Sequence, residues 1–178
     1  MGFLGRDRAC RRALHLGFPP RRSHLKIGLI SDTHGLLRPE ALRVLRGSRH
    51  IIHAGDIGDP AILETLRGIA PLTAVRGNND RERWARTIAE TAQLDLEGAR
   101  IYVVHNISEL AIDPVAAGVQ AIVSGHSHRP HIERKNGVLY VNPGSAGPRR
   151  FSLPVSLGTL DVGRGSVKAR LITLFKFA

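Results

Sequence analysis

Cysteine is almost absent from this sequence, since Cys10 is the only one among 178 residues. A single cysteine forms neither an internal disulfide nor a zinc site rich in thiolates. We therefore expect a fold that depends on its hydrophobic core, in a protein of the cytoplasm.

Aromatic residues and long apolar runs are also scarce. Aromatic side chains make up 4% of the chain, which argues against a surface that stacks the bases of single-stranded nucleic acid. No segment approaches the roughly 18 consecutive apolar residues of a membrane-spanning helix. The apolar stretch at residues 13–18 is too short for the core of a signal peptide. We expect neither a membrane partner nor export.

Acidic residues are outnumbered, and the formal net charge is +11. Residues 1–24 hold six arginines and one aspartate, which contribute +5 and leave +6 for the rest of the chain. This first segment has no sustained hydrophobic periodicity. We expect residues 1–24 to be a basic, disordered extension and residues 25–178 to form one domain. A basic domain suits an anionic substrate, whereas a charge this diffuse does not favour nucleic acid.

The pattern of expected elements changes halfway along the domain. Strands at 26–30, 49–53 and 72–75 alternate with helices at 39–46, 61–66 and 81–89. Hairpins then dominate, at 93–104, around Asn136-Gly137 and at 155–174, with a helix near 109–117 and a strand at 121–124. The order predicts an α/β fold, a four-layer αββα sandwich of two mixed β-sheets flanked by helices.

Metal-binding residue types follow the expected strands. The first strand ends in Asp32 and His34, which share one face if the strand stays extended through both. The other strand ends supply Asp56, Asn78, His105, His126 and His128. If all these ends meet at one rim, they offer seven nitrogen and oxygen ligands, more than one cation needs. Two cations sharing a bridging carboxylate would use the whole set.

These motifs, in this order, resemble the calcineurin-like metallophosphoesterase superfamily: Asp32-x-His34, Gly55-Asp56-x-x-Asp59, Gly77-Asn78, His105 and Gly125-His126-x-His128. The short length and the segment Asn142-Pro143-Gly144-Ser145 are similar to its small phosphodiesterase branch, the YfcE-type proteins. The resemblance implies a hydrolase that cleaves phosphodiesters of small molecules by attack of a hydroxide bridging two metal ions.

The resemblance also implies a role for each residue. Asp32, His34 and His128 would bind one metal, Asn78, His105 and His126 the other, and Asp56 both. Asp56, Asn78 and Asp59 are predicted to be catalytic, with Asp59 orienting a ligand. Imidazole and carboxylate ligands favour two divalent ions, manganese first, with iron, zinc or nickel as alternatives.

Two departures from the family pattern concern the substrate. Asn79 stands where many relatives carry a histidine thought to protonate the leaving group, and where the YfcE-type branch usually has cysteine. His105 is followed by Asn106-Ile107 instead of glycine. Asn79 and Arg149 are predicted to bind the substrate, Arg149 by holding a phosphate with its planar guanidinium. The other histidines, His53 included, are predicted to be surface or hydrogen-bonded core residues.

Two other functions stay open. The small subunit of retromer resembles the same fold but serves as a protein-binding scaffold, and the positive charge also suits a nuclease. The presence of all seven ligands favours the enzyme. Homo-oligomerisation stays open as well.

Overall fold

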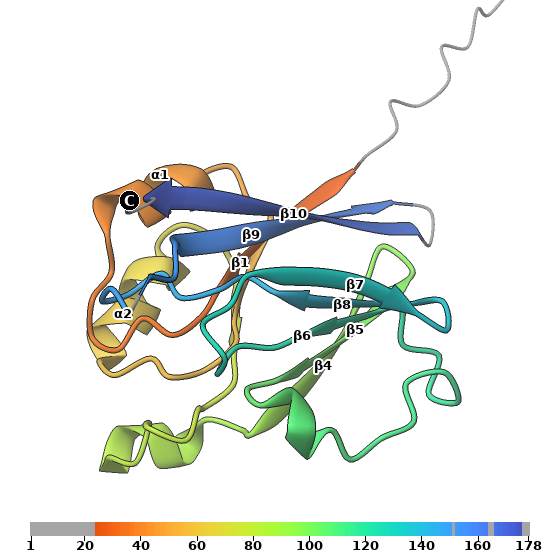
Figure 1. The fold of residues 1–178 in the computed structure, drawn as a ribbon, viewed down its shortest axis with the longest axis horizontal. Coiled ribbons are helices and arrows are strands. Elements are labelled where there is room, and N and C mark those ends of the chain that lie inside the picture. The colour runs from red at the N-terminus through yellow and green to blue at the C-terminus, as the bar shows by residue number, and fades with distance from the viewer. Residues whose placement is uncertain (1–23, 151, 164–165, 176–178) are drawn as a thin grey trace, which may run out of the picture.

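The structure is a computed structural model that describes residues 24–150, 152–163 and 166–175. Apart from His24, the predicted N-terminal extension lies outside these residues. The described chain folds into two five-stranded β-sheets packed against each other (Figure 1).

The first sheet has the order β10-β9-β1-β2-β3. Strands β1 (Leu25–Ile30), β2 (His50–His53) and β3 (Leu72–Ala74) are parallel. The C-terminal hairpin of β9 (Val155–Gly163) and β10 (Ser166–Phe175) adds to β1 in antiparallel fashion. A parallel half and an antiparallel half therefore make one mixed sheet, as predicted.

The second sheet has the order β4-β5-β6-β8-β7 and is also mixed. Its centre is the parallel set β5 (Ala99–Val104), β6 (Ala121–Val123) and β8 (Val138–Asn142). The edges are β4 (Thr91–Leu96) and β7 (His131–Lys135), each paired antiparallel through a hairpin. The hairpins turn at Glu97-Gly98 and Asn136-Gly137, the places that the sequence predicts.

The main core lies between the sheets. Ile27, Leu29 and Leu160 of the first sheet meet Ile101 and Val123 of the second in one cluster of buried side chains. A second cluster joins the outer face of the first sheet to α1 (Pro39–Leu45) and α2 (Pro60–Arg67). Both helices start at a proline, which suits the first helical position because its missing N–H has no intrahelical partner there. Figure 1 shows them on the same side of the molecule.

The outer face of the second sheet is covered by residues 107–119 instead of a helix. Val119 and the half-buried Leu110 and Ile112 pack there against Ile122 and Val138. The helix predicted near 109–117 was wrong: only the short 3-10 helix η2 (Ile107–Glu109) and a turn capped by the carboxylate of Asp113 form. Two residues limit this segment to single turns. Pro114 cannot donate a backbone hydrogen bond, and Gly118 has a φ of +67°.

Residues 81–89, also predicted to be helical, contain the 3-10 helix η1 (Arg83–Thr87). The predicted two-sheet α/β sandwich is nevertheless confirmed. No helix among the described residues is long and apolar enough to span a membrane.

Candidate metal centre

The seven predicted ligands lie together in space. They come from the segments that follow β1, β2, β3, β5 and β6, because the carboxyl ends of these parallel strands meet at one rim of the two sheets. They form two groups of side chains, and the carboxylate of Asp56 lies between the groups.

The first group consists of His34, His128 and Asp32. The Nε2 atoms of the two histidines are 3.3 Å apart, and His128 Nε2 is 3.2 Å from Asp32 Oδ1. Donor atoms bound at about 2.1 Å to a common ion lie roughly 3.0 to 3.4 Å apart. The three side chains are therefore spaced as ligands of one cation, and their donor atoms all fall within 4.8 Å of one another.

The second group consists of Asn78, His105 and His126. Asn78 Oδ1 lies 3.1 Å from His105 Nε2 and 3.0 Å from His126 Nδ1. The Nδ1–H group of His105 donates to the carbonyl of Ala54 at 2.7 Å, which leaves the Nε2 lone pair directed at the site. A histidine fixed through its second nitrogen in this way is typical of metal ligands.

Asp56 lies between the two groups. Its Oδ2 atom is 3.8 Å from His34 Nε2 and 3.5 Å from His105 Nε2. Burial alone raises the pKa of Asp56, but the neighbouring His105 and two hydrogen bonds from Asn79 outweigh it and hold this pKa well below its ordinary value. Asp56 is thus a buried, ionised carboxylate that faces both groups. Two buried carboxylates, Asp32 and Asp56, surrounded by imidazoles suit divalent cations.

The backbone at the site is unusual. Five of the predicted ligands have φ between +44° and +68°, the left-handed region that side chains other than glycine rarely adopt: Asp32, His34, Asp56, His126 and His128. The expectation that Asp32 and His34 share a face of an extended strand was therefore wrong, since β1 ends at Ile30. The two side chains reach one site through a coiled backbone, and such conformations cluster at functional sites.

Two glycines allow the close approach of these segments. A Cβ on Gly77 would lie 2.1 Å from Asp56 Oδ1, and one on Gly125 would lie 2.0 Å from Ser31 Oγ and 2.8 Å from Asp32 Oδ2. No side chain fits at either position without displacing a predicted ligand.

Polar neighbours fix the ligand Asp32 and the loop that carries His126 and His128. Ser31 Oγ donates to Asp32 Oδ2 at 2.7 Å, and the His126 N–H donates to the same atom at 3.2 Å. Asn142 Nδ2 donates to the carbonyl of Gly125 at 2.6 Å and to Ser127 Oγ at 3.0 Å. The Asn-Pro-Gly-Ser segment thus contributes a support for the metal-site loop.

Asp80 is a supporting residue that the sequence reasoning missed. Its buried carboxylate accepts hydrogen bonds from the backbone N–H groups of Ile57, Gly58 and Gly77. It therefore ties the loop of Asp56 to the loop of Asn78. The only hint of this role in the sequence was that Asp80 stands two residues after the predicted ligand Asn78, in the segment Gly77-Asn78-Asn79-Asp80. Asp59, predicted to orient a ligand, instead is exposed and accepts the N–H of Ala61 as the N-cap of α2.

The pKa values of two histidines of the site, His34 and His105, shift in opposite directions. Burial lowers the pKa of His34, although Asp56 and Asp32 oppose the shift, while the nearby charge of Arg150 adds to it. Burial also disfavours the charged form of His105, but Asp56 and the Ala54 carbonyl outweigh it and raise its pKa. His34 is thereby kept neutral, the form that binds metals.

The two predicted substrate-binding residues lie in different surroundings. Asn79 donates its backbone N–H to Asp56 Oδ1 at 2.9 Å and its side-chain N–H to Asp56 Oδ2 at 2.6 Å. Arg149 is exposed on the segment that follows Gly147, and this glycine packs on the backbone of Asp32 and Thr33. The positive charge of Arg150 on this segment is the last of the causes that shift the pKa of His34.

Comparison with known proteins identifies relatives that match most of the described domain. A model of the calcineurin-like phosphoesterase superfamily domain matches residues 25–165. A probable metallophosphoesterase of Methanothermobacter thermautotrophicus is 33% identical over 82% of this chain and 91% of the relative. A phosphodiesterase of Methanocaldococcus jannaschii is 26% identical over 77% of this chain and 93% of the relative.

Solved structures share the fold. The phosphoesterase YfcE of E. coli superposes with a TM-score of 0.61 at 22% identity, covering 84% of this chain and all of YfcE. Vacuolar protein sorting 29 of Cryptosporidium parvum superposes with a TM-score of 0.68 at 17% identity, covering 86% of this chain and 99% of that protein. One fold thus occurs in proteins named as enzymes and in proteins named for sorting.

Proposed function

This chain belongs to the calcineurin-like phosphoesterase superfamily, and we propose that it hydrolyses phosphodiesters at a centre of two divalent metal ions. It is a phosphoesterase hydrolase of this family, which confirms the resemblance read from its motifs. The position of Asp56 carries the proposal for two ions. Its carboxylate faces two separate groups of ligand atoms, and each group has the spacing of atoms that share one cation.

The predicted ligands fall into one set for each metal ion. Asp32, His34 and His128 would hold one ion, Asn78, His105 and His126 would hold the other, and Asp56 would contact both. When bound, two divalent ions activate water for in-line attack and stabilise charge on the phosphoryl oxygens. Nitrogen and oxygen ligands without thiolate favour manganese. A negative carboxylate at the centre offsets the repulsion between the two cations.

The protein's own hydrogen bonds set the geometry. Asn79 donates to both oxygens of Asp56 and so fixes the plane of the carboxylate. This contact gives Asn79 a positioning role beside its predicted contact with substrate. Arg149 and Arg150 provide positive charge for the phosphate.

The leaving group has no titratable partner at position 79, because an asparagine amide does not transfer protons at neutral pH. His53, another histidine close to Asp56 in the sequence, is fully buried, and its Nδ1 and Nε2 atoms are engaged with Gly55 N and Thr33 Oγ1. We therefore expect the rate to depend steeply on the pKa of the departing alcohol. Aryl phosphodiesters should be cleaved much faster than alkyl ones, and the Asn79→His variant should gain only on alkyl esters, by roughly 10²-fold.

A metal analysis combined with a substrate panel tests the proposal. The purified chain should bind two metal ions and hydrolyse bis(p-nitrophenyl) phosphate when loaded with Mn²⁺. The same panel should include phosphomonoesters and single- and double-stranded DNA at several salt concentrations. A protein that binds two metals without turnover of any ester would instead favour the scaffold function of its sorting relatives. Cleavage of DNA that falls steeply with salt would favour a nuclease.

A further inference from the structure

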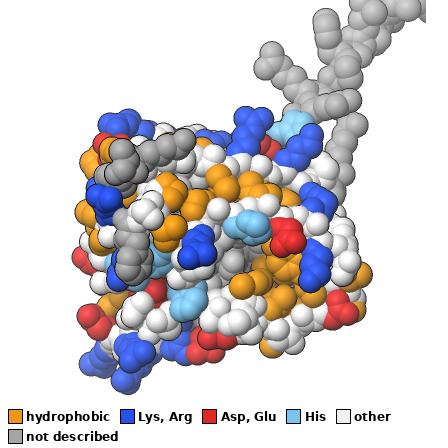
Figure 2. Space-filling model, in the orientation of Figure 1, with side chains coloured by type: hydrophobic (Ala, Val, Ile, Leu, Met, Phe, Trp, Pro, Cys, Tyr) orange, Lys and Arg blue, Asp and Glu red, His pale blue; other side chains and the backbone are white. Residues whose placement is uncertain are grey.

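A cleft of about 460 Å³ opens beside the metal centre, on the outer face of the second sheet. One wall is formed by β7 and β8, and the other by Ile107, where residues 107–119 leave this end of the sheet uncovered. Figure 2 shows the surface hollowed here, with hydrophobic side chains next to charged ones. Its volume lies within the range of pockets that hold small organic molecules.

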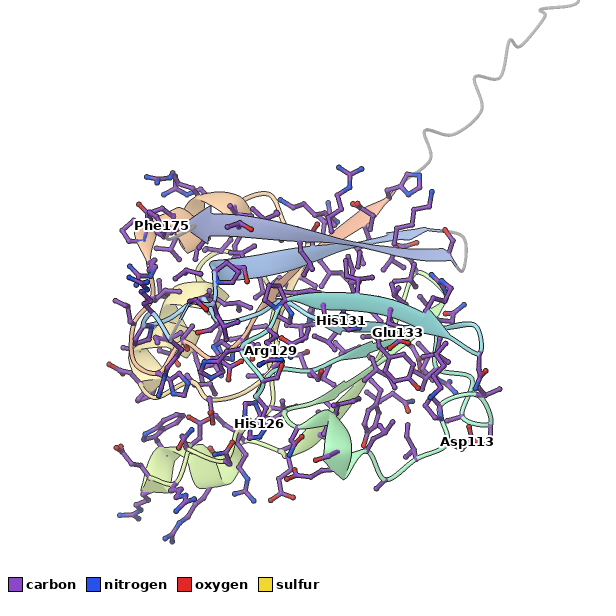
Figure 3. All side chains as sticks on the ribbon, viewed as in Figure 1. Asp113, His126, Arg129, His131, Glu133 and Phe175 are labelled. Atoms are coloured by element: carbon purple, nitrogen blue, oxygen red, sulfur yellow. The ribbon has the colours of Figure 1, made fainter. Side chains whose placement is uncertain are left out.

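The cleft joins two kinds of surface. Ile107, Pro130 and Tyr140 supply apolar area, and Ile107 is 43% exposed although it is a large aliphatic side chain. Arg129, His131 and Glu133 stand at the rim, as Figure 3 shows, and the last two are 3.6 Å apart from nitrogen to oxygen. A flat ring with an apolar face and a hydrogen-bonding edge matches this combination.

The cleft is lined by neighbours in sequence of the predicted metal ligands. Ser127, which lines it, stands between the ligands His126 and His128. Ile107 follows the ligand His105 by two residues, and Asn142, which also lines the cleft, supports the loop of Ser127. A phosphate held at the metal centre therefore brings one of its ester groups within reach of this cleft.

We propose that this cleft binds the non-leaving ester group of the substrate, and that this group is a nucleoside. The inference rests on the proposed phosphodiesterase function and adds the substrate class. The base would pack on Ile107 and Tyr140, while Arg129 donates and Glu133 accepts hydrogen bonds at its edge. A simple alkyl ester leaves this apolar surface exposed to water, and a sugar without a base offers no flat face to it.

Substrates that share one leaving group test the proposal. The full-length protein loaded with Mn²⁺ is assayed with methyl p-nitrophenyl phosphate and with the p-nitrophenyl ester of thymidine 5′-monophosphate. Both release p-nitrophenolate, so only the retained ester group differs. We expect kcat/KM to be roughly tenfold or more higher for the nucleoside ester, mainly through KM. Equal values for the two substrates would overturn the proposal.

Variants of residues that line the cleft test whether the preference for the nucleoside ester arises there. Ile107→Ala should lower the preference roughly tenfold and Glu133→Ala by a similar factor, with the methyl ester unaffected. Ile132→Ala is the matched control, because Ile132 lies between His131 and Glu133 on the opposite face of β7 and is 37% exposed. A preference that survives both cleft variants would place the nucleoside elsewhere.

A binding measurement separates this inference from the proposed function. Thymidine 5′-monophosphate is titrated into the protein by calorimetry, which needs no turnover. Binding that Ile107→Ala weakens, in a protein that cleaves neither ester, would support the cleft and reject the hydrolase. Cleavage of both esters without a difference in binding between the native chain and the variant would reject the cleft alone.

Discussion

The two ends of the β-sheets use the same rare backbone conformation for different purposes. At one end, Glu97 and Asn136 adopt positive φ in hairpin turns, each followed by a glycine. A Cβ on Gly98 or Gly137 would meet nothing within 4 Å, so these turns are open to solvent. Their conformation follows from local sequence, since Asn-Gly and similar pairs favour turns that require positive φ.

At the other end, positive φ occurs in five predicted metal ligands that are held in place by distant parts of the chain. The Asp32 N–H donates to the Gly55 carbonyl and the His34 N–H to the Asp56 carbonyl. Each such residue costs on the order of 1 kcal/mol or more, which the surrounding contacts must supply. The comparison teaches that the turns are encoded locally, whereas the site depends on packing between segments far apart in sequence.

The largest expected effect comes from removing the charge at the centre of the site. In Asp56→Asn the negative charge shared by the two groups is lost, and we expect kcat/KM to fall by roughly 10³-fold together with the metal content. Asn78→Ala, which affects one group only, should be less damaging. Elemental analysis of both variants measures the metal content per chain. Two metals and normal turnover in Asp56→Asn would exclude the bridging role.

A matched pair of glycine substitutions sharpens the comparison between the two ends. Gly77→Ala places a methyl group against Asp56 and should reduce turnover by roughly 10²-fold, because a displacement of about 1 Å is enough for such a loss. Gly137→Ala, at φ +83° in an open turn, should cost only about 1 kcal/mol of stability and leave turnover unchanged. Thermal unfolding and steady-state kinetics of both variants measure these effects. Similar kinetic losses in the two variants would show that the ends do not differ as argued.

A third pair separates Asp80 from Asp59. Because Asp80 accepts three backbone N–H groups between the loops of Asp56 and Asn78, we expect Asp80→Asn to lower metal affinity 10- to 100-fold. Asp59→Ala removes a helix cap and should cost about 1 kcal/mol of stability with turnover within twofold. Metal titration of both variants distinguishes them. A larger loss of affinity in Asp59→Ala would restore the role predicted from the sequence motif.

Much of the fold was predictable because its signals are local. Short apolar runs and glycine turns indicated the strands and hairpins, and Pro39 and Pro60 stand at the starts of the two helices. The helix expected near 109–117 failed because apolar spacing resembles a helix even where Pro114 and Gly118 prevent one. The hydrophobic residues of this segment cover the second sheet from single turns as well as they would from a helix.

The site was predictable as a set of residues but not as a geometry. Residue types at successive strand ends indicated Asp32, Asp56 and His126 without any knowledge of the backbone between them. Asp80 was missed because its partners are backbone N–H groups, which no side-chain pattern reveals. The cleft beside Ile107 depends on where a loop stops covering a sheet, and only the tertiary structure shows this.

The last prediction concerns the effect on stability of His53, which is fully buried beneath the site. Burial lowers its pKa from 6.5 to about 4, opposed by nearby carboxylates. Its Nδ1 accepts the Gly55 N–H, so a second proton has no acceptor there. Between these two pKa values the unfolded chain binds a proton that the folded chain does not, so His53 makes stability fall as pH falls from 6.5 towards 4. From about pH 7.5 to about pH 5 the loss is roughly 2 kcal/mol.

In His53→Gln, whose amide can still donate to Thr33, this part of the pH dependence should vanish, although the variant is less stable at neutral pH. Urea unfolding at both pH values measures the difference, with His131→Gln as the control for an exposed imidazole. An unchanged pH dependence in His53→Gln would mean that His53 titrates alike in the folded and unfolded chains.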